Sequence, residues 1–269
     1  MDDAIERAIE CIWERYSEPL SLTQIAESAL LSRFYFARLF REATGITPGR
    51  FLAAIRIHQA KRLLLSTPMS ITDISSAVGY NSLGSFTNYF TASVGVSPGQ
   101  FRRLSRTGGF GLPLPPEDPR TGFGAVAGPI SLPAGQGSTR VYIGAFPTLI
   151  MQHPAVAAIV ADVPIDRPAC YYLPDVPEGT WFVHAVGVAD GPETIGAGAI
   201  GAGADPSALC ADRAALIGRH DSVTVTEGNV TSAAVRLRYA GPADPPVLLA
   251  LPDLLPPRSL AVATGRPAS

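Results

Sequence analysis

Apolar residues in the first hundred positions recur at intervals of three or four, which is the period of a helix with one buried face. Ile5, Ile9 and Ile12 begin the pattern, within a segment that runs from residue 3 to residue 16. Serine and proline residues that suit helix N-termini precede the later apolar segments. The sequence therefore predicts helices at residues 3–16, 22–29, 33–43, 48–66, 71–78, 83–93 and 98–104.

Residues 21–51 and 70–101 are two copies of one pattern, the second with a single inserted residue. Each copy predicts a short helix, a tight turn and a second helix, which is a helix-turn-helix. Each copy also closes on one phrase, GITPGRF in the first and GVSPGQF in the second. The glycine of the phrase can end a helix in the left-handed conformation, and its proline suits the first turn of the next helix.

Other patterns follow residue 106. Residues 107–138 are dense in glycine and proline, and we expect a linker or loop without regular structure there. After that, β-branched and aromatic segments bounded by turn residues predict strands. They lie at residues 139–146, 169–173, 179–189, 222–238 and 246–252, the fourth being a hairpin that turns at residues 227–229.

The expected fold is therefore multidomain. At 269 residues the chain is long enough for two domains of ordinary size. An all-α double helix-turn-helix domain at residues 1–106 is followed by the linker at 107–138 and by a mainly-β sandwich at 139–269.

Charge is unevenly distributed along the chain. Residues 30–106 contain ten basic and two acidic residues, although the whole chain has a formal net charge of −2. A basic helix-turn-helix segment indicates an affinity for the phosphate groups of DNA. The helix at 48–66 would span roughly 28 Å at about 1.5 Å per residue. That length suits a rod between two recognition helices in successive major grooves, about 34 Å apart.

The second helix of each copy is the expected recognition helix. The residues expected to face inward are Phe36, Leu39 and Phe40 in the first copy and Phe86, Tyr89 and Phe90 in the second. In the first copy this leaves an arginine-rich face for guanine and phosphate oxygens. The outward face of the second copy carries no charge, so we expect the first copy to contribute more affinity. The predicted DNA contacts are Arg33, Phe34, Ala37, Arg38, Arg41, Ser82, Leu83, Gly84, Ser85, Thr87, Asn88 and Arg102.

The segments SLTQIAESALLS, FARLFREATGITPGRFL and SFTNYFTASVGVSPGQFRR resemble the DNA-binding domain of AraC/XylS-type transcription regulators, over nearly all of residues 1–106. The resemblance implies a two-lobed helical domain that binds double-stranded promoter DNA and contacts RNA polymerase. Similar proteins often carry basic residues where this chain has Asn88 and Thr91, so the resemblance also implies altered contacts in the second lobe. They commonly place this domain at the C-terminus, whereas here it comes first.

The segments YYLPDVPEGTWFVHAVGVAD and SVTVTEGNVTSAAVRLR resemble carboxypeptidase-regulatory-like, transthyretin-type β-sandwiches. The resemblance implies a non-catalytic role, either sensing of a small-molecule effector or self-association as a homodimer. Tyr171, Trp181 and His184 are the candidate ligand contacts. Packing in the core of the sandwich is the alternative for these side chains.

Two short motifs raise the alternative of an enzyme. Residues 95–99 fit G-x-S-x-G, but a hydrolase elbow follows a strand and this segment is predicted to be helical. Residues 196–201 fit G-x-G-x-x-G, but no βαβ unit surrounds them, so a loop is favoured over dinucleotide binding. The histidines and cysteines show no metal-ligand spacing. We expect no enzyme, with no catalytic residues, metal or cofactor.

The N-terminus lacks the basic start and apolar run of a signal peptide, and no stretch of about 18 apolar residues occurs, so we expect a cytoplasmic protein without membrane contact. The predicted function is a sequence-specific, AraC-type DNA-binding transcription regulator with a C-terminal ligand-sensing or self-association domain. The alternative is a constitutive DNA-binding adaptor whose β-sandwich binds a partner protein.

Overall fold

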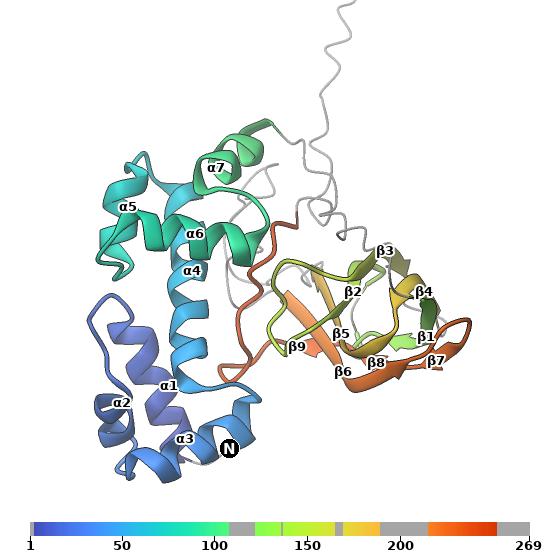
Figure 1. Cartoon of the computed structure of the whole chain (residues 1–269), viewed down its shortest axis with the longest axis horizontal. Helices are drawn as coiled ribbons and strands as arrows, with labels where there is room; N and C mark the ends of the chain where they lie inside the picture. Colours follow the sequence, from blue (N-terminus) through green and yellow to red (C-terminus); the bar gives the residue numbers. More distant parts are fainter. Residues whose placement is uncertain (1–2, 108–121, 136, 165–168, 189–214, 252–269) are drawn as a thin grey trace, which may run out of the picture.

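A computed structural model describes residues 3–107, 122–135, 137–164, 169–188 and 215–251 of the chain. Helices occupy the N-terminal part and strands the C-terminal part, so the predicted multidomain fold is confirmed (Figure 1). Among the described residues, no helix is both long and apolar enough to cross a membrane.

The helices begin where the apolar pattern predicts them, and their C-terminal ends differ from the prediction by at most three residues. Most N-termini carry the expected caps: the Ser21 side chain accepts from the Gln24 amide and the Ser82 side chain from the Ser85 amide. Ser32 makes no such bond. The helices are α1 (Asp3–Arg15), α2 (Leu22–Ser28), α3 (Arg33–Thr44), α4 (Pro48–Ser66), α5 (Ile71–Ala77), α6 (Leu83–Val94) and α7 (Pro98–Thr107).

The repeated phrase has the same structural role in both copies. Gly45 ends α3 with φ of 81°, and Gly95 ends α6 with φ of 94°, a conformation that side chains with a Cβ rarely adopt. The phenylalanine that closes each phrase then packs edge-on against its recognition helix. Phe51 lies 5.4 Å from Phe40, and Phe101 lies 5.8 Å from Phe90, between ring centroids. Each phrase thus ends one helix, starts the next and anchors the second to the first.

Two sheets form the C-terminal sandwich. The five-stranded sheet has the order β3 (Ala157–Val163), β2 (Thr139–Phe146), β5 (Gly179–Val188), β6 (Ala215–Val225), β9 (Arg238–Tyr239), with antiparallel neighbours. In the other sheet β1 (Phe123–Ser131) pairs antiparallel with β4 (Ala169–Pro177) and parallel with β7 (Val230–Ser232) and β8 (Val235–Arg236). Alternate residues such as Ile143, Leu173 and Val183 fill the core between the sheets.

The expectation that residues 107–138 lack regular structure is wrong for residues 123–131, which form β1. Glycine and proline obscured the strand in the sequence. Gly128 is required there because a Cβ at this position would collide with the carbonyl oxygen of Ala233. The buried Val126 and Ile130 on either side of it supply the apolar face of the strand.

Two further strand predictions are corrected. The chain does turn at Gly228, but β7 leaves β6 and pairs with β1 of the opposite sheet, so residues 222–238 form a corner between sheets instead of a hairpin. Residues 246–251 of the predicted strand 246–252 form no strand. They run between the helices and the five-stranded sheet, and we call them the strap (Figure 1).

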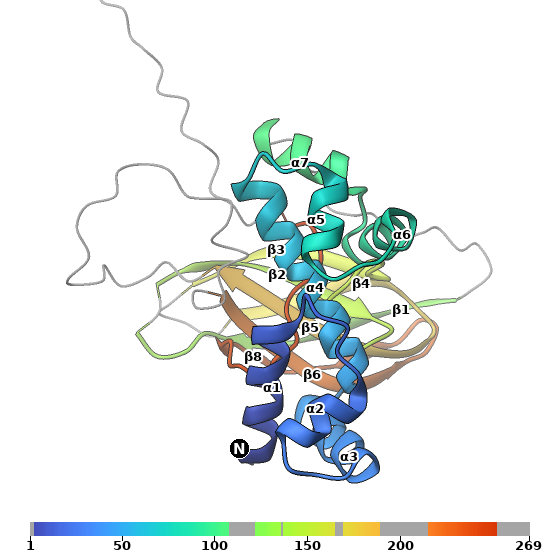
Figure 2. The same ribbon diagram turned by 90° about the vertical axis from the view of Figure 1, so that its left-hand side faces the viewer.

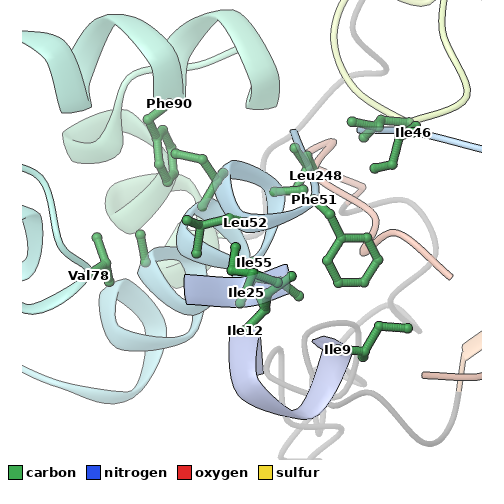
Figure 3. Packing of buried hydrophobic residues seen from close by; sticks show 14 of the residues in the cluster. Ile9, Ile12, Ile25, Ile46, Phe51, Leu52, Ile55, Val78, Phe90 and Leu248 are labelled. Carbon is green, nitrogen blue, oxygen red and sulfur yellow. The ribbon is translucent and has the colours of Figure 1, made fainter. Parts of the chain in front are cut away.

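The helical part and the sandwich share a packed interface. The strap and the loop between β2 and β3, residues 147–156, contribute Leu248, Ala250 and Ile150 to the apolar cluster of the helices. Figure 3 shows Leu248 in this cluster, together with Phe51, Leu52 and Ile55 of α4. The outer face of the five-stranded sheet, around Tyr142 and Val186, packs against the strap from the other side.

Backbone hydrogen bonds extend this interface to the second helix-turn-helix. The amide of His153 donates to the carbonyl of Ser93 (2.8 Å), and the amide of Ala250 donates to the carbonyl of Val94 (3.2 Å). The amide of Leu248 donates to the carbonyl of Met151 (3.0 Å), which ties the strap to the β2–β3 loop. One end of the sandwich therefore contacts both α4 and the C-terminal end of α6.

Candidate nucleic-acid interface

The two expected recognition helices present the same positions to solvent. In α3 the inward residues Phe36 and Phe40 are fully buried, and in α6 Phe86 and Phe90 are fully buried, as the spacing predicted. Leu39 and Tyr89 are partly buried in the matching positions. The two helices thus share one orientation relative to the core of their own unit, and each turns the opposite face outward.

The outward face of α3 combines arginine with aromatic rings. Phe34 is 79% exposed, and the guanidinium carbon of Arg33 lies 4.8 Å from the centre of its ring. The guanidinium of Arg38 lies 5.4 Å from the ring of Tyr35. Stacking on a ring limits the rotamers of an arginine while leaving its N–H groups free to bind an acceptor. The surface therefore suits guanine edges and phosphate oxygens.

Other contacts of the predicted α3 residues are weak. Arg38 Nε lies 4.0 Å from Glu42 Oε1, and both side chains are well exposed, so the ion pair holds Arg38 only loosely. Arg41 is exposed one turn further along the helix, and Ala37 is partly buried beside it. Sequence reasoning missed Tyr35, which is 47% exposed. Its place directly before the buried Phe36 was the available signal, because adjacent helical residues point in different directions.

The outward face of α6 is uncharged and carries smaller side chains than that of α3. Ser82 caps the helix, Leu83 is exposed, and a Cβ at Gly84 would meet no atom within 4 Å. Ser85 and Asn88 are exposed, and Thr87 is partly buried. This face can offer hydroxyl, amide and apolar contacts to DNA, and it lacks the phosphate-binding charge of α3.

Arg102 lies on α7, apart from the recognition helices. Its guanidinium donates to the carbonyl oxygens of Met69 (2.7 Å) and Leu64 (3.3 Å), so it fastens α7 to the end of α4. A contact between Arg102 and DNA stays a prediction. Ser97 of the G-x-S-x-G pattern is also structural, since its hydroxyl lies 2.9 Å from Gln100 Oε1 at the start of α7. The G-x-G-x-x-G pattern lies outside the described residues.

The units are held at opposite ends of α4. This helix has 19 residues, which at about 1.5 Å per residue span roughly 28 Å. Figures 1 and 2 show α3 near one end of α4 and α6 near the other, on the same side of that helix. The C-terminal ends of both recognition helices also approach the β2–β3 loop. A Cβ at Gly45 would lie 2.8 Å from Leu149 Cδ1, and a Cβ at Gly95 would lie 3.1 Å from His153 Nδ1.

Residues 25–104 match a family model described as a helix-turn-helix domain. This part of the chain is a helix-turn-helix domain of the AraC type. The match covers both units except for the start of α2, and it includes every DNA contact predicted above. The N-terminal resemblance is thereby confirmed, whereas the likeness of the C-terminal part to transthyretin-type sandwiches is not.

Curated relatives match little more than a third of this chain. The HTH-type transcriptional regulator YobQ of Bacillus subtilis is 33% identical over 95 residues, which are 35% of this chain and 39% of that protein. The melibiose operon regulatory protein of Escherichia coli K12 is 31% identical over 102 residues, or 38% of this chain and 34% of that protein. The chain thus spans little more than a third of the length of these relatives.

A solved structure also matches more than a third of this chain. It is the DNA-binding domain of the global transcriptional factor AdpA in complex with a target DNA. The sequence identity is 28%, the match covers 38% of this chain and 93% of that chain, and the TM-score is 0.37.

The three candidate ligand contacts in the sandwich do not lie together. The hydroxyl of Tyr171 donates to the carbonyl of Ala233 (2.7 Å) inside the core, and Trp181 Nε1 donates to the carbonyl of Pro177 (2.7 Å). His184 instead faces outward from the five-stranded sheet and lines a pocket near the helices. Ligand binding by Tyr171 and Trp181 stays a prediction. Among the described residues, no group of three histidine, cysteine or acidic side chains is placed to hold a metal.

Burial controls the charge of His184. The side chain is 6% exposed, its Nε2 lies 3.1 Å from the carbonyl oxygen of Thr148, and its ring packs 5.4 Å from that of Phe146. Loss of hydration disfavours the charged form and lowers the pKa of His184 to about 4. The imidazole is therefore neutral near pH 7, with Nε2–H donating to Thr148.

Proposed function

We propose that this protein is a sequence-specific, DNA-binding transcription regulator of AraC type. The observation that carries the proposal is the pair of matching recognition helices, α3 and α6, at the two ends of α4 on one side of it. A single chain can then enter two successive major grooves without a partner. The names of YobQ and the melibiose operon regulatory protein, both transcription regulators, support the proposal.

The two units have unequal tasks in the proposed complex. The arginines of α3 contact phosphates and guanine edges and supply most of the affinity. Asn88 and the hydroxyl groups of α6 add sequence preference with little charge. Binding weakens as salt concentration rises, because each neutralised phosphate releases counterions. Contact with RNA polymerase and a cytoplasmic location belong to the same proposal.

The proposed role of the sandwich is to sense a small molecule or to mediate self-association. Its contacts with α4 and with the ends of both recognition helices support a regulatory role, because a conformational change in the sandwich would alter the positions of the DNA-binding units. The alternative is a constitutive adaptor whose sandwich binds another protein. Co-purification of one defined protein, with no small molecule that shifts the melting temperature, would favour that alternative.

Selection of duplexes from a random pool, followed by fluorescence anisotropy with the enriched site, tests the DNA-binding function. The Arg38→Ala variant should lose about 1 to 3 kcal/mol of binding free energy, or roughly ten- to a hundredfold in affinity, if Arg38 makes a bidentate base contact. Arg140→Ala, on the exposed end of β2, is the matched control and should bind like the wild type. Equal affinity of the Arg38→Ala variant and the wild type would remove that contact. Failure of the full chain to enrich any duplex at low ionic strength would remove the function.

A further inference from the structure

A pocket of about 250 Å³ opens between the sandwich and the segments that join it to the helices. Its floor is the outer face of β5 and β6, and its walls come from the β2–β3 loop, the strap, and the chain around β8 and β9. The lining includes four large apolar residues, namely Leu149, Met151, Ile217 and Val247. An apolar cavity of about 150 Å³ can hold benzene, so this pocket has room for a ring or short chain with a polar group attached.

The same lining also contains three arginines. Arg219, Arg236 and Arg238 converge on it from β6, β8 and β9. Asp244 is the acidic residue of the lining, and it is already bound by Arg238 through two hydrogen bonds of 2.7 and 2.6 Å. Within the described part of the chain, neither Arg219 nor Arg236 forms an ion pair. Two exposed arginines that no described carboxylate neutralises therefore belong to the lining of the pocket.

We propose that this pocket binds a small organic anion, a monocarboxylate with an apolar body. The carboxylate lies between Arg219 and Arg236, whose planar guanidinium groups match its two oxygens. The apolar body lies against Leu149, Met151 and Val247. Neutral His184 and the closed Arg238–Asp244 pair complete the polar side of the pocket without adding charge.

The lining residues connect the pocket to the DNA-binding units. Leu149 and Arg219 are the side chains that a Cβ at Gly45 would meet, at 2.8 and 3.6 Å, at the C-terminal end of α3. The carbonyl of Val247 accepts a hydrogen bond from Lys61 on α4 (3.2 Å). The charged group of a bound ligand draws Arg219 toward itself, and the apolar body of the ligand draws Val247. Binding of the ligand therefore changes contacts with α3 and α4 together. This regulatory consequence rests on the proposed DNA-binding function, whereas the binding site does not.

Titration of the full chain with three carboxylates tests the site. The probes are sodium phenylacetate, cyclohexanecarboxylate and hexanoate, each paired with its neutral amide at the same millimolar concentration. At least one carboxylate should raise the melting temperature and give a saturable calorimetric isotherm, and its amide should not. Arg219→Gln and Arg236→Gln should each weaken binding about ten- to a hundredfold, the usual value of a hydrogen bond to a charged group. Arg140→Gln should leave it unchanged.

Three results would overturn parts of the inference separately. If none of the carboxylates binds the wild type, or if both pocket variants bind as the wild type does, the site is wrong. If a carboxylate binds but the affinity for the enriched duplex does not change, the coupling is wrong. Linkage requires that the carboxylate and the duplex each change the affinity of the protein for the other by the same factor. If no duplex is enriched, the proposed DNA-binding function fails while the pocket stands.

Discussion

Replacing Lys61 by methionine should weaken the connection between the two parts of the chain. Lys61 is the only lysine of the sequence and is 4% exposed on α4. Its ammonium group donates to three carbonyl oxygens of the strap: Val247 at 3.2 Å, Leu248 at 3.1 Å and Leu249 at 2.8 Å. Three donors on one nitrogen suit three converging acceptors, whereas the flat guanidinium of arginine does not.

The size of the loss follows from what methionine leaves behind. Methionine keeps the unbranched stem, so little packing is lost, and it removes the cost of burying the ammonium group. The strap carbonyls remain, and Leu248 and Leu249 are buried residues. A buried acceptor without a partner costs about 1–3 kcal/mol. Because two such carbonyls lose their donor, the free energy of unfolding should fall in Lys61→Met by about 2–6 kcal/mol, less the cost of burying the ammonium group that methionine removes.

Guanidinium denaturation of the full chain measures this loss, with Arg62→Met on the exposed side of α4 as the control. A second readout uses the fact that the chain has one lysine. In the wild type the strap should shield Lys61, so an acylating ester should modify Lys61 far more slowly than the N-terminal amine. Mass spectrometry measures the two rates of acylation. Unchanged stability in Lys61→Met, or acylation of Lys61 as fast as in the denatured chain, would show that the strap is not held by this group.

Two more predictions concern the buried His184 and the exposed Gly84. The folded-state pKa of His184 is about 4, below the ordinary 6.5, so as the pH falls the unfolded chain binds a proton at His184 before the folded chain does. The contribution of neutral His184 to the free energy of unfolding is therefore present above pH 6.5 and is lost as the pH falls toward 4. Between pH 7 and pH 5 the free energy of unfolding should fall by about 2 kcal/mol. His184→Gln should flatten this slope in urea titrations at each pH, and a slope identical to that of the wild type would contradict the assignment. Gly84→Ala in α6 should raise the free energy of unfolding by about 0.5–1 kcal/mol, since the Cβ meets nothing and alanine favours a helix. A lower melting temperature in that variant would show that the position is constrained.

The helical part could be predicted from the sequence because its signals are local. Apolar spacing, caps such as Ser21 and the paired phrases lie within a few residues of the structure that they cause. The candidate DNA contacts follow from the same spacing, because burial of Phe36 and Phe86 fixes which residues face outward. The same spacing also leaves Tyr35 outside the core, although Tyr35 was not among the predicted contacts.

The sandwich was harder to predict because its signals depend on distant partners. The glycine at position 128 reads as a loop residue until the chain near Ala233 is known to pass against it. The sequence of the strap, PVLLAL, predicts a strand because it is apolar throughout. In the structure its carbonyl oxygens accept hydrogen bonds from Lys61, and its amides donate to the carbonyl oxygens of Met151 and Val94. The pocket unites segments from residue 149 to residue 247, and no local pattern marks it.

The repeated phrase also gives the sandwich a way to contact both units. Because each phrase ends its recognition helix with a left-handed glycine, the chain turns sharply at Gly45 and at Gly95, and no side chain projects there. The β2–β3 loop occupies both spaces, with Leu149 at the first glycine and His153 at the second. A duplicated helix ending thus provides two equivalent contact points, and the two side chains that occupy them lie four positions apart in one loop. A shift of this loop relative to the sheet would therefore act on α3 and α6 together.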